Sequence, residues 1–259
     1  MSFIAKKRKV LWVVLIAIIT TVFIYSLFQI IRTLHDYSEG SKTYDNLTAD
    51  IVTTNTIDSS DDETETQTEQ APITVDFNSL LDQNSDVVGW LYCENTPINY
   101  PVLQSTDNNY YLRRMIDKKY NIAGSIFMDY RSNPDLSSLN TIIYGHNMKN
   151  DTMFGTFTEY NEQAYYDEHP VLWFLTPEQD YKIELIAGYV TPSTSDVYKD
   201  FYSKDELNAH IKDSMDKSTF VSGVNITEVD SIVTLSTCSY EYSTARYVLI
   251  GNIKEINKK

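Results

Sequence analysis

The amino-acid sequence predicts a mostly β domain, a sandwich or a barrel, that follows a membrane helix and a stalk. From residue 72 onward, short runs of branched and aromatic residues alternate with polar turns, which is typical of all-β folds. A single run near the N-terminus, residues 10–31, is long, apolar and uncharged. We therefore divide the chain into a basic segment (1–9), a transmembrane helix (10–31), a stalk (32–71) and one β domain (72–259).

The N-terminal region predicts one membrane span. The run VLWVVLIAIITTVFIYSLFQII (10–31) contains no charged residue, and a helix of this length crosses a hydrocarbon layer of about 30 Å. The basic cluster at residues 6–9 precedes it, so we expect a cytoplasmic N-terminus and an extracellular domain. A cleaved signal peptide is the alternative, but the apolar run is longer than usual and no small-x-small cleavage site follows it.

An acidic, Thr-rich stalk is predicted for residues 32–71, with a flexible part from Tyr44 to about Ala71. The sequence TADIVTTNTIDSSDDETETQTEQAP (48–72) has few large apolar side chains, so burial would not repay the entropy of ordering it. The whole chain has 36 Asp and Glu against 21 Lys and Arg, a formal net charge of -15. This balance argues against a nucleic-acid partner, because a phosphate backbone is bound by clustered Lys and Arg.

Within the domain, DFNSLLDQN (76–84) suits a short helix. The predicted strands are VVGWLYC (87–93), TPINYPVL (96–103), GSIFMDY (124–130), NTIIYG (140–145), VLWFLT (171–176), YKIELIAGYV (181–190), SIVTLSTC (231–238) and ARYVLIGNI (245–253). One helix interrupts them at SKDELNAHIKDSMDK (203–217). Ser203 and Glu206 have the spacing of a capping box, and Leu207, Ile211 and Met215 share one face.

Cys238 lies at the end of a predicted strand and faces an arginine across a turn. Strand alternation places it on the side of Thr234 and Ser236, and a hairpin through SYEYST brings it near Arg246. A neighbouring guanidinium favours the thiolate over the thiol. From these residues alone two other interpretations stay open: a small buried side chain, and a disulfide with Cys93, the other cysteine of the chain.

Among the four histidines, His146 is the candidate for chemistry. It follows a buried strand in NTIIYGHNMKN (140–150), at the strand end, although a plain turn residue has the same appearance. We interpret His35 as a solvated flank, His169 as a loop residue and His210 as a packing residue. The histidines and cysteines do not have the spacing of a zinc site, so we predict neither a metal nor another cofactor.

Several segments together resemble a class B sortase, a membrane-anchored cysteine transpeptidase of Gram-positive bacteria. They are DVVGWLYCENTPINYPVLQSTDNNYYL (86–112), GSIFMDYR (124–131), NTIIYGHNM (140–148), MFG (153–155) and TLSTC (234–238) with a downstream Arg. The resemblance implies a closed sortase-type β-barrel with N-terminal helices and one additional helix before the strand that carries the cysteine.

The resemblance also implies roles for three residues. Cys238 attacks the carbonyl after Thr in an Asn-Pro-x-Thr-like sorting signal and forms a thioacyl enzyme. His146 protonates the departing amine and deprotonates the incoming one, and Arg246 stabilises the oxyanion. The acceptor is expected to be a peptidoglycan amine. Positions implied to bind the sorting signal are Asn108, Leu112, Tyr144, Thr194, Tyr198, Ser236 and Thr237.

One position departs from the family pattern. Some relatives have an acidic residue two positions after the cysteine, but this chain has Tyr240 there, followed by Glu241. We therefore expect a Cys-His-Arg arrangement rather than a Cys-His-Asp triad. A papain-like hydrolase is disfavoured because its cysteine precedes its histidine in sequence. A pilus-type sortase and a non-enzymatic surface adhesin remain as alternatives.

Overall fold

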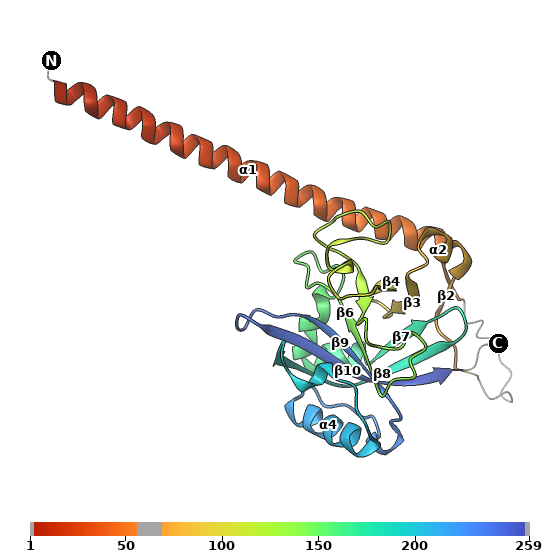
Figure 1. Cartoon of the computed structure of the whole chain (residues 1–259). Helices are drawn as coiled ribbons and strands as arrows, with labels where there is room; N and C mark the ends of the chain where they lie inside the picture. Colours follow the sequence, from red (N-terminus) through yellow and green to blue (C-terminus); the bar gives the residue numbers. More distant parts are fainter. Residues whose placement is uncertain (1–2, 56–68, 257–259) are drawn as a thin grey trace. The chain divides into compact units, whose positions relative to one another are not determined.

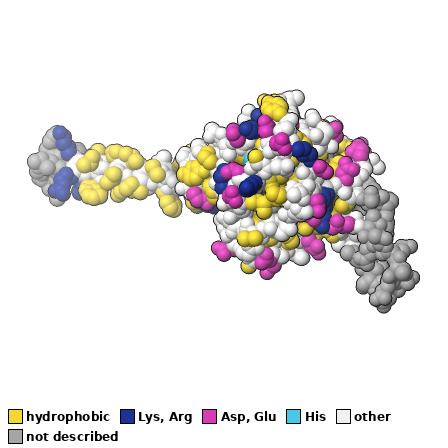
Figure 2. All heavy atoms as spheres, turned by 90° about the horizontal axis from the view of Figure 1, so that it is seen from below, with side chains coloured by type: hydrophobic (Ala, Val, Ile, Leu, Met, Phe, Trp, Pro, Cys, Tyr) yellow, Lys and Arg dark blue, Asp and Glu magenta, His cyan; other side chains and the backbone are white. Residues whose placement is uncertain are grey.

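The structure, a computed structural model, describes residues 3–55 and 69–256, with side chains from residue 7. Two compact units are present, one ending at Glu39 and one beginning at Gly40, and each is described by itself. Helix α1 (Phe3–Ile51) begins in the first unit and ends in the second. It contains a stretch that is long and apolar enough to cross a membrane, and many large apolar side chains are exposed along residues 10–34 (Figure 2).

The flexible part of the stalk is predicted wrongly for residues 44–55. This segment forms the last turns of α1 and strand β1 (Val52–Thr54), which pairs antiparallel with β2 (Ile73–Val75). Tyr44, Leu47 and Ile51 are buried, because their spacing of three and four residues places them on one helix face. The sequence around these three residues is Thr-rich and acidic, so the short apolar stripe did not predict a packed helix. Residues 56–68, the acidic centre of the predicted stalk, lie outside the described residues.

A closed β-barrel forms the second unit (Figure 1). Its strand order is β10-β8-β7-β3-β4-β5-β6-β9, with parallel pairing of β4 with β5 and of β6 with β9, and antiparallel pairing elsewhere. The strands are β3 (Val87–Tyr92), β4 (Asn99–Gln104), β5 (Ile126–Met128), β6 (Asn140–Tyr144), β7 (Val171–Leu175), β8 (Asp180–Pro192), β9 (Ile232–Cys238) and β10 (Ala245–Ile256). Each of the eight predicted runs overlaps one of these strands, and the predicted barrel is confirmed.

Three further helices accompany the barrel: α2 (Phe77–Gln83), α3 (Gln163–Glu168) and α4 (Lys204–Lys217). Short 3-10 turns are η1 (Tyr111–Arg113), η2 (Gly155–Asn161), η3 (Asp196–Tyr198) and η4 (Ile226–Glu228). The N-terminus of α4 is capped nearly as predicted. Ser203 Oγ accepts from the Glu206 N–H, while Glu206 Oε2 accepts from the N–H of Tyr202 rather than from that of Ser203.

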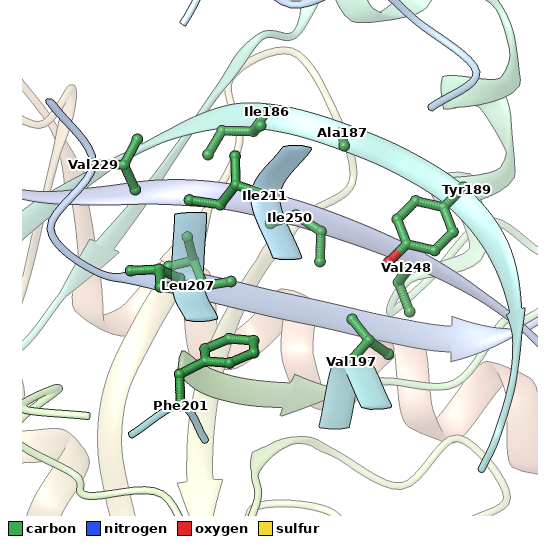
Figure 3. Packing of buried hydrophobic residues seen from close by; sticks show 11 residues of the cluster. Ile186, Ala187, Tyr189, Val197, Phe201, Leu207, Ile211, Val229, Val248 and Ile250 are labelled. Atoms are coloured by element: carbon green, nitrogen blue, oxygen red, sulfur yellow. The ribbon is translucent and has the colours of Figure 1, made fainter. Parts of the chain in front are cut away.

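Helix α4 covers part of the barrel with an apolar face. Leu207 and Ile211 are fully buried in a cluster that includes Ile186 of β8 and Val248 and Ile250 of β10 (Figure 3). Met215, the third predicted member of this face, is only partly buried against the cluster. The helix therefore closes one region of the barrel surface and leaves the neighbouring region, at the ends of β6, β9 and β10, open.

Candidate active site

A cleft of about 490 Å³ lies at the ends of β6, β9 and β10. All ten residues that the sequence singled out line it: Asn108, Leu112, Tyr144, His146, Thr194, Tyr198, Ser236, Thr237, Cys238 and Arg246. They come from segments more than a hundred residues apart in the sequence. The barrel topology is what brings them together.

Strand pairing explains how three of these residues meet. Cys238 ends β9, which lies between β6 and β10 in the barrel. On one side the antiparallel register places Arg246 directly opposite Cys238. On the other side the parallel register pairs Tyr144 with Ser236, and His146 and Cys238, each two residues further along the chain, both line the cleft. The predicted hairpin between Cys238 and Arg246 is confirmed.

The thiol of Cys238 is free and partly exposed to the cleft. Cys93 is also a free thiol, but it is buried, and its Sγ donates to the Val171 carbonyl at 3.5 Å. The disulfide alternative is therefore wrong. Burial raises the pKa of the Cys93 thiol to about 11, so this cysteine has no thiolate near neutral pH.

The backbone just before His146 is closely packed. Gly145 has no room for a side chain, because a Cβ atom there would lie 2.5 Å from Ile126 Cδ1 and 2.7 Å from the ring of Phe154. Its N–H donates to the Ser236 carbonyl at 3.1 Å and extends the pairing of β6 with β9. This close packing fixes the backbone at the strand end and directs His146 into the cleft.

The imidazole of His146 is held through one nitrogen. Nε2 donates to the Leu112 carbonyl at 2.7 Å, since a carbonyl oxygen only accepts, and this leaves Nδ1 to exchange a proton. Burial lowers the pKa of His146, and the positive charges of Arg113 and Arg246 lower it further, while the bond to Leu112 acts in the opposite direction. His146 is thus mostly neutral at pH 7.

Among the residues that the structure describes, no carboxylate is hydrogen-bonded to the imidazole of His146. In the described part of the chain, the hydrogen-bond partner of the His146 ring is the backbone of Leu112. Glu241 accepts instead from the hydroxyl of Ser239, and the side chain of Tyr240 is exposed. The Cys-His-Arg arrangement stays a prediction, with the Leu112 carbonyl as the partner of the imidazole.

Arg246 Nη1 donates to the Ala245 carbonyl at 2.9 Å. The N–H of Ser239, the first residue after Cys238, donates to the same oxygen at 3.0 Å. Two donors beside Cys238 thus converge on one carbonyl oxygen. The guanidinium has five N–H groups in all, so Arg246 can bind a second acceptor in the cleft.

Aromatic and hydroxyl side chains form one wall of the cleft. The rings of Tyr144 and Tyr198 stack with centroids 6.1 Å apart, and Tyr198 Oη shares a hydrogen bond of 2.9 Å with Ser236 Oγ. Thr237 differs from its neighbours, because its Oγ1 is buried and has no hydrogen-bond partner among the described residues. Among the described residues its hydroxyl therefore makes no hydrogen bond to the thiol of Cys238.

Sequence reasoning missed several residues of this cleft. Arg131 and Lys199 line it and add positive charge, and Asp196 adds a carboxylate. Arg131 lies within the GSIFMDYR segment, but nothing local indicates that it reaches the same cleft as Cys238. The one described group of three potential metal ligands, His35, Asp36 and Glu39, is not part of the cleft lining.

A second, more open hollow of about 450 Å³ adjoins this cleft. Asn147 and Ser239, the residues that follow His146 and Cys238, line the second hollow together with Asp151, Glu159 and Glu241. Asn147 Nδ2 donates to the Cys238 carbonyl at 2.9 Å. The two strand ends therefore separate two hollows, with the thiol and imidazole facing the first.

Comparisons with known proteins agree with this geometry. The family model described as the sortase domain matches residues 91–254. Sortase B of Staphylococcus aureus is 36% identical over 185 residues, covering 70% of this chain and 75% of that protein. A solved S. aureus sortase B–substrate complex is 33% identical with a TM-score of 0.65, covering 70% of this chain and 85% of the other. Sortase B complexed with triglycine has the same identity and TM-score and covers 70% and 86%.

Proposed function

Since the chain belongs to the sortase family and is a sortase B-type cysteine transpeptidase, we propose that it cleaves a sorting signal after Thr and joins a surface protein to a peptidoglycan amine. The signal is Asn-Pro-x-Thr-like, with Asn or Gly after the Thr. The observation that carries the proposal is the register of β9, which sets Cys238 opposite Arg246 of β10 and pairs Ser236 with Tyr144 of β6, two residues before His146, so that all three candidate residues line one cleft.

The reaction divides into two acyl transfers. His146 first takes the proton of the Cys238 thiol on Nδ1. The resulting thiolate attacks the Thr carbonyl carbon, an S–C bond forms, and the peptide C–N bond breaks as the His146 imidazolium passes that proton to the leaving amine. The acceptor amine then attacks the thioester and loses a proton to His146, which restores the thiolate. With Nε2 bound to the Leu112 carbonyl, Nδ1 of His146 carries the proton in both steps.

Arg246 stabilises the negative charge on the carbonyl oxygen in each step. Its Nη1 already binds the Ala245 carbonyl, and its remaining N–H groups serve the substrate oxygen. The Ser239 N–H contributes only if it exchanges the Ala245 oxygen for that of the substrate. An oxyanion donor of this kind lowers the barrier by about 2.7–4 kcal/mol.

The two hollows fit a reaction with two substrates. The sorting signal occupies the cleft between Asn108, Tyr144 and Thr194, on the side that the thiol faces. Relatives solved with a substrate and with triglycine support a peptide and an amine as partners. The acyl group fills the first cleft after the first step, so the amine has access to the thioester from the side of the second hollow.

The N-terminal helix anchors the enzyme in the cell membrane. Its apolar stretch is long enough to span, and the basic residues before it favour a cytoplasmic N-terminus. The catalytic domain then lies outside the cell, next to the peptidoglycan.

The first test is a search for the thioacyl enzyme. We would incubate the full chain in detergent with quenched Asn-Pro-x-Thr peptides that continue with Asn or Gly, and locate adducts by mass spectrometry. A Thr-ended adduct on Cys238, absent from Cys238→Ala, is the expected result. Adding triglycine or an N-acetyl-lysine peptide would then identify the acceptor, and a preference for a lysine of another protein would favour the pilus-type alternative. Cleavage of no peptide would overturn the proposal and favour an adhesin.

A further inference from the structure

A buried carboxylate lies behind the wall of the sorting-signal cleft. Asp129 follows β5, and its side chain is completely buried. It is not among the residues that line the cleft. Nevertheless, the side chains bonded to it, those of Asn108, Arg131 and Tyr144, all line that cleft.

The carboxylate accepts five hydrogen bonds. Oδ2 accepts from Asn108 Nδ2 at 2.9 Å, from Tyr144 Oη at 3.0 Å and from Arg131 Nη2 at 2.8 Å. Oδ1 accepts from the Nε and the backbone N–H of Arg131, both at 2.9 Å. Arg131 thus binds both oxygens with its guanidinium, the geometry in which such pairs are strongest. The three partners come from three different segments of the chain.

Only the ionised carboxylate can satisfy this set of donors. Burial alone would raise the pKa of Asp129, but the hydrogen bonds from Arg131, Asn108 and Tyr144 outweigh it and hold the pKa at about 2. A protonated acid or an amide carries hydrogens of its own, so it would turn a donor toward groups that also donate. The arrangement therefore requires a charge at this position at neutral pH.

Contacts extend from this carboxylate toward the catalytic residues. Tyr144 is two residues before His146 on β6, and its ring stacks on Tyr198. Tyr198 in turn is hydrogen-bonded to Ser236, two residues before Cys238 on β9. Displacement of the Tyr144 ring would change the shape of the cleft on both sides of the catalytic pair.

We propose that Asp129 is a positioning residue for peptide binding, whose carboxylate holds Asn108, Arg131 and Tyr144 in the arrangement that receives the sorting signal. Asp129 does not itself touch the peptide. The inference rests on the proposed function, because it assigns the cleft to a sorting-signal peptide. It adds a determinant of affinity that lies outside the cleft.

The test is the Asp129→Asn variant of the full chain in detergent. We expect KM for the Asn-Pro-x-Thr peptide that the parent cleaves best to rise about tenfold or more while kcat stays within about threefold, because the wall is disturbed and the reacting groups are not. Fluorescence anisotropy of the same peptide, labelled with fluorescein, on the Cys238→Ala background should show an equal rise in Kd. Asp135→Asn is the matched control, since Asp135 is an exposed carboxylate on the same loop and binds the Ser137 N–H.

Tyr144→Phe tests the same contact from its other end. It removes only the hydroxyl that donates to Asp129, and we expect it to raise KM by a smaller factor. If Asp129→Asn does not fold, this variant alone decides the inference. In the double variant the two changes should be less than additive.

The outcomes separate the inference from the proposed function. Folded Asp129→Asn with unchanged KM and Kd would overturn the inference, as would a fall in kcat alone. A lower unfolding temperature with unchanged KM would leave Asp129 a purely structural residue. A parent enzyme that neither cleaves nor binds any sorting-signal peptide would instead overturn the proposed function.

Discussion

One face of β9 and β10 has two environments. By strand alternation Arg246, Val248 and Ile250 share a face, as do Ile232 and Cys238. Where this face is apolar, α4 and η3 cover it and Val248 and Ile250 are completely buried (Figure 3). Where it carries Cys238 and Arg246, it is open to the cleft. The covering elements, rather than the strands, separate the stabilising region from the reactive one.

The largest expected effect is at the open end. Cys238→Ala should reduce peptide cleavage about 10⁴-fold or more, because the covalent route is lost. Its matched control is Cys93→Ala, which removes the other, buried thiol and should leave kcat for the folded protein unchanged. A quenched-peptide assay measures both, and residual turnover by Cys238→Ala close to that of the parent would contradict the assignment.

In the region that α4 covers, a substitution should change the free energy of unfolding rather than the activity. Leu207→Ala removes a fully buried side chain between α4 and the barrel, and should lower the free energy of unfolding by about 2–5 kcal/mol. Urea unfolding of the full chain in detergent measures the change, and Val221→Ala, at a side chain that is 80% exposed, is the control expected to stay within about 0.5 kcal/mol. Loss of kcat in the fraction that remains folded would contradict the separation of the two regions.

Some features of the two regions could be predicted from the sequence and others could not. The strands, the face of α4 and the Cys238–Arg246 pair follow from alternation, helical spacing and one short turn, all of which are local. The packing of residues 44–55 was missed because its apolar stripe consists of only Tyr44, Leu47 and Ile51 in a polar segment. Asp129 and Arg131 were missed because their role depends on partners in three segments, which only the tertiary structure brings together.

A smaller loss of activity is expected when the positive charge beside the thiol is kept but the planar guanidinium of Arg246 is replaced by an ammonium. Arg246→Lys should lower kcat about 10²–10³-fold, because an ammonium cannot bind the Ala245 carbonyl and the substrate oxygen with fixed geometry at the same time. Single-turnover acylation of Cys238 measures this loss directly. The control is Lys182→Arg, which changes a side chain paired with Glu184 and outside the cleft. Equal acylation rates for Arg246→Lys and the parent would show that charge alone is sufficient.

The smallest expected effect is on the pH dependence of stability. Each of the two regions contributes to it through one buried histidine. Burial lowers the pKa of His146 in the cleft and of His210 on α4. The unfolded chain therefore binds more protons than the folded chain as the pH falls through about 6.5, so stability is greatest above that pH and decreases below it. We expect the unfolding temperature to fall between about pH 7.5 and about pH 5.5, where Asp and Glu remain ionised. His146→Gln and His210→Gln should each reduce this fall, but only His146→Gln should also abolish transpeptidation, because only that imidazole faces the thiol. An unfolding temperature as pH-dependent in the double variant as in the parent would mean that neither buried histidine is responsible.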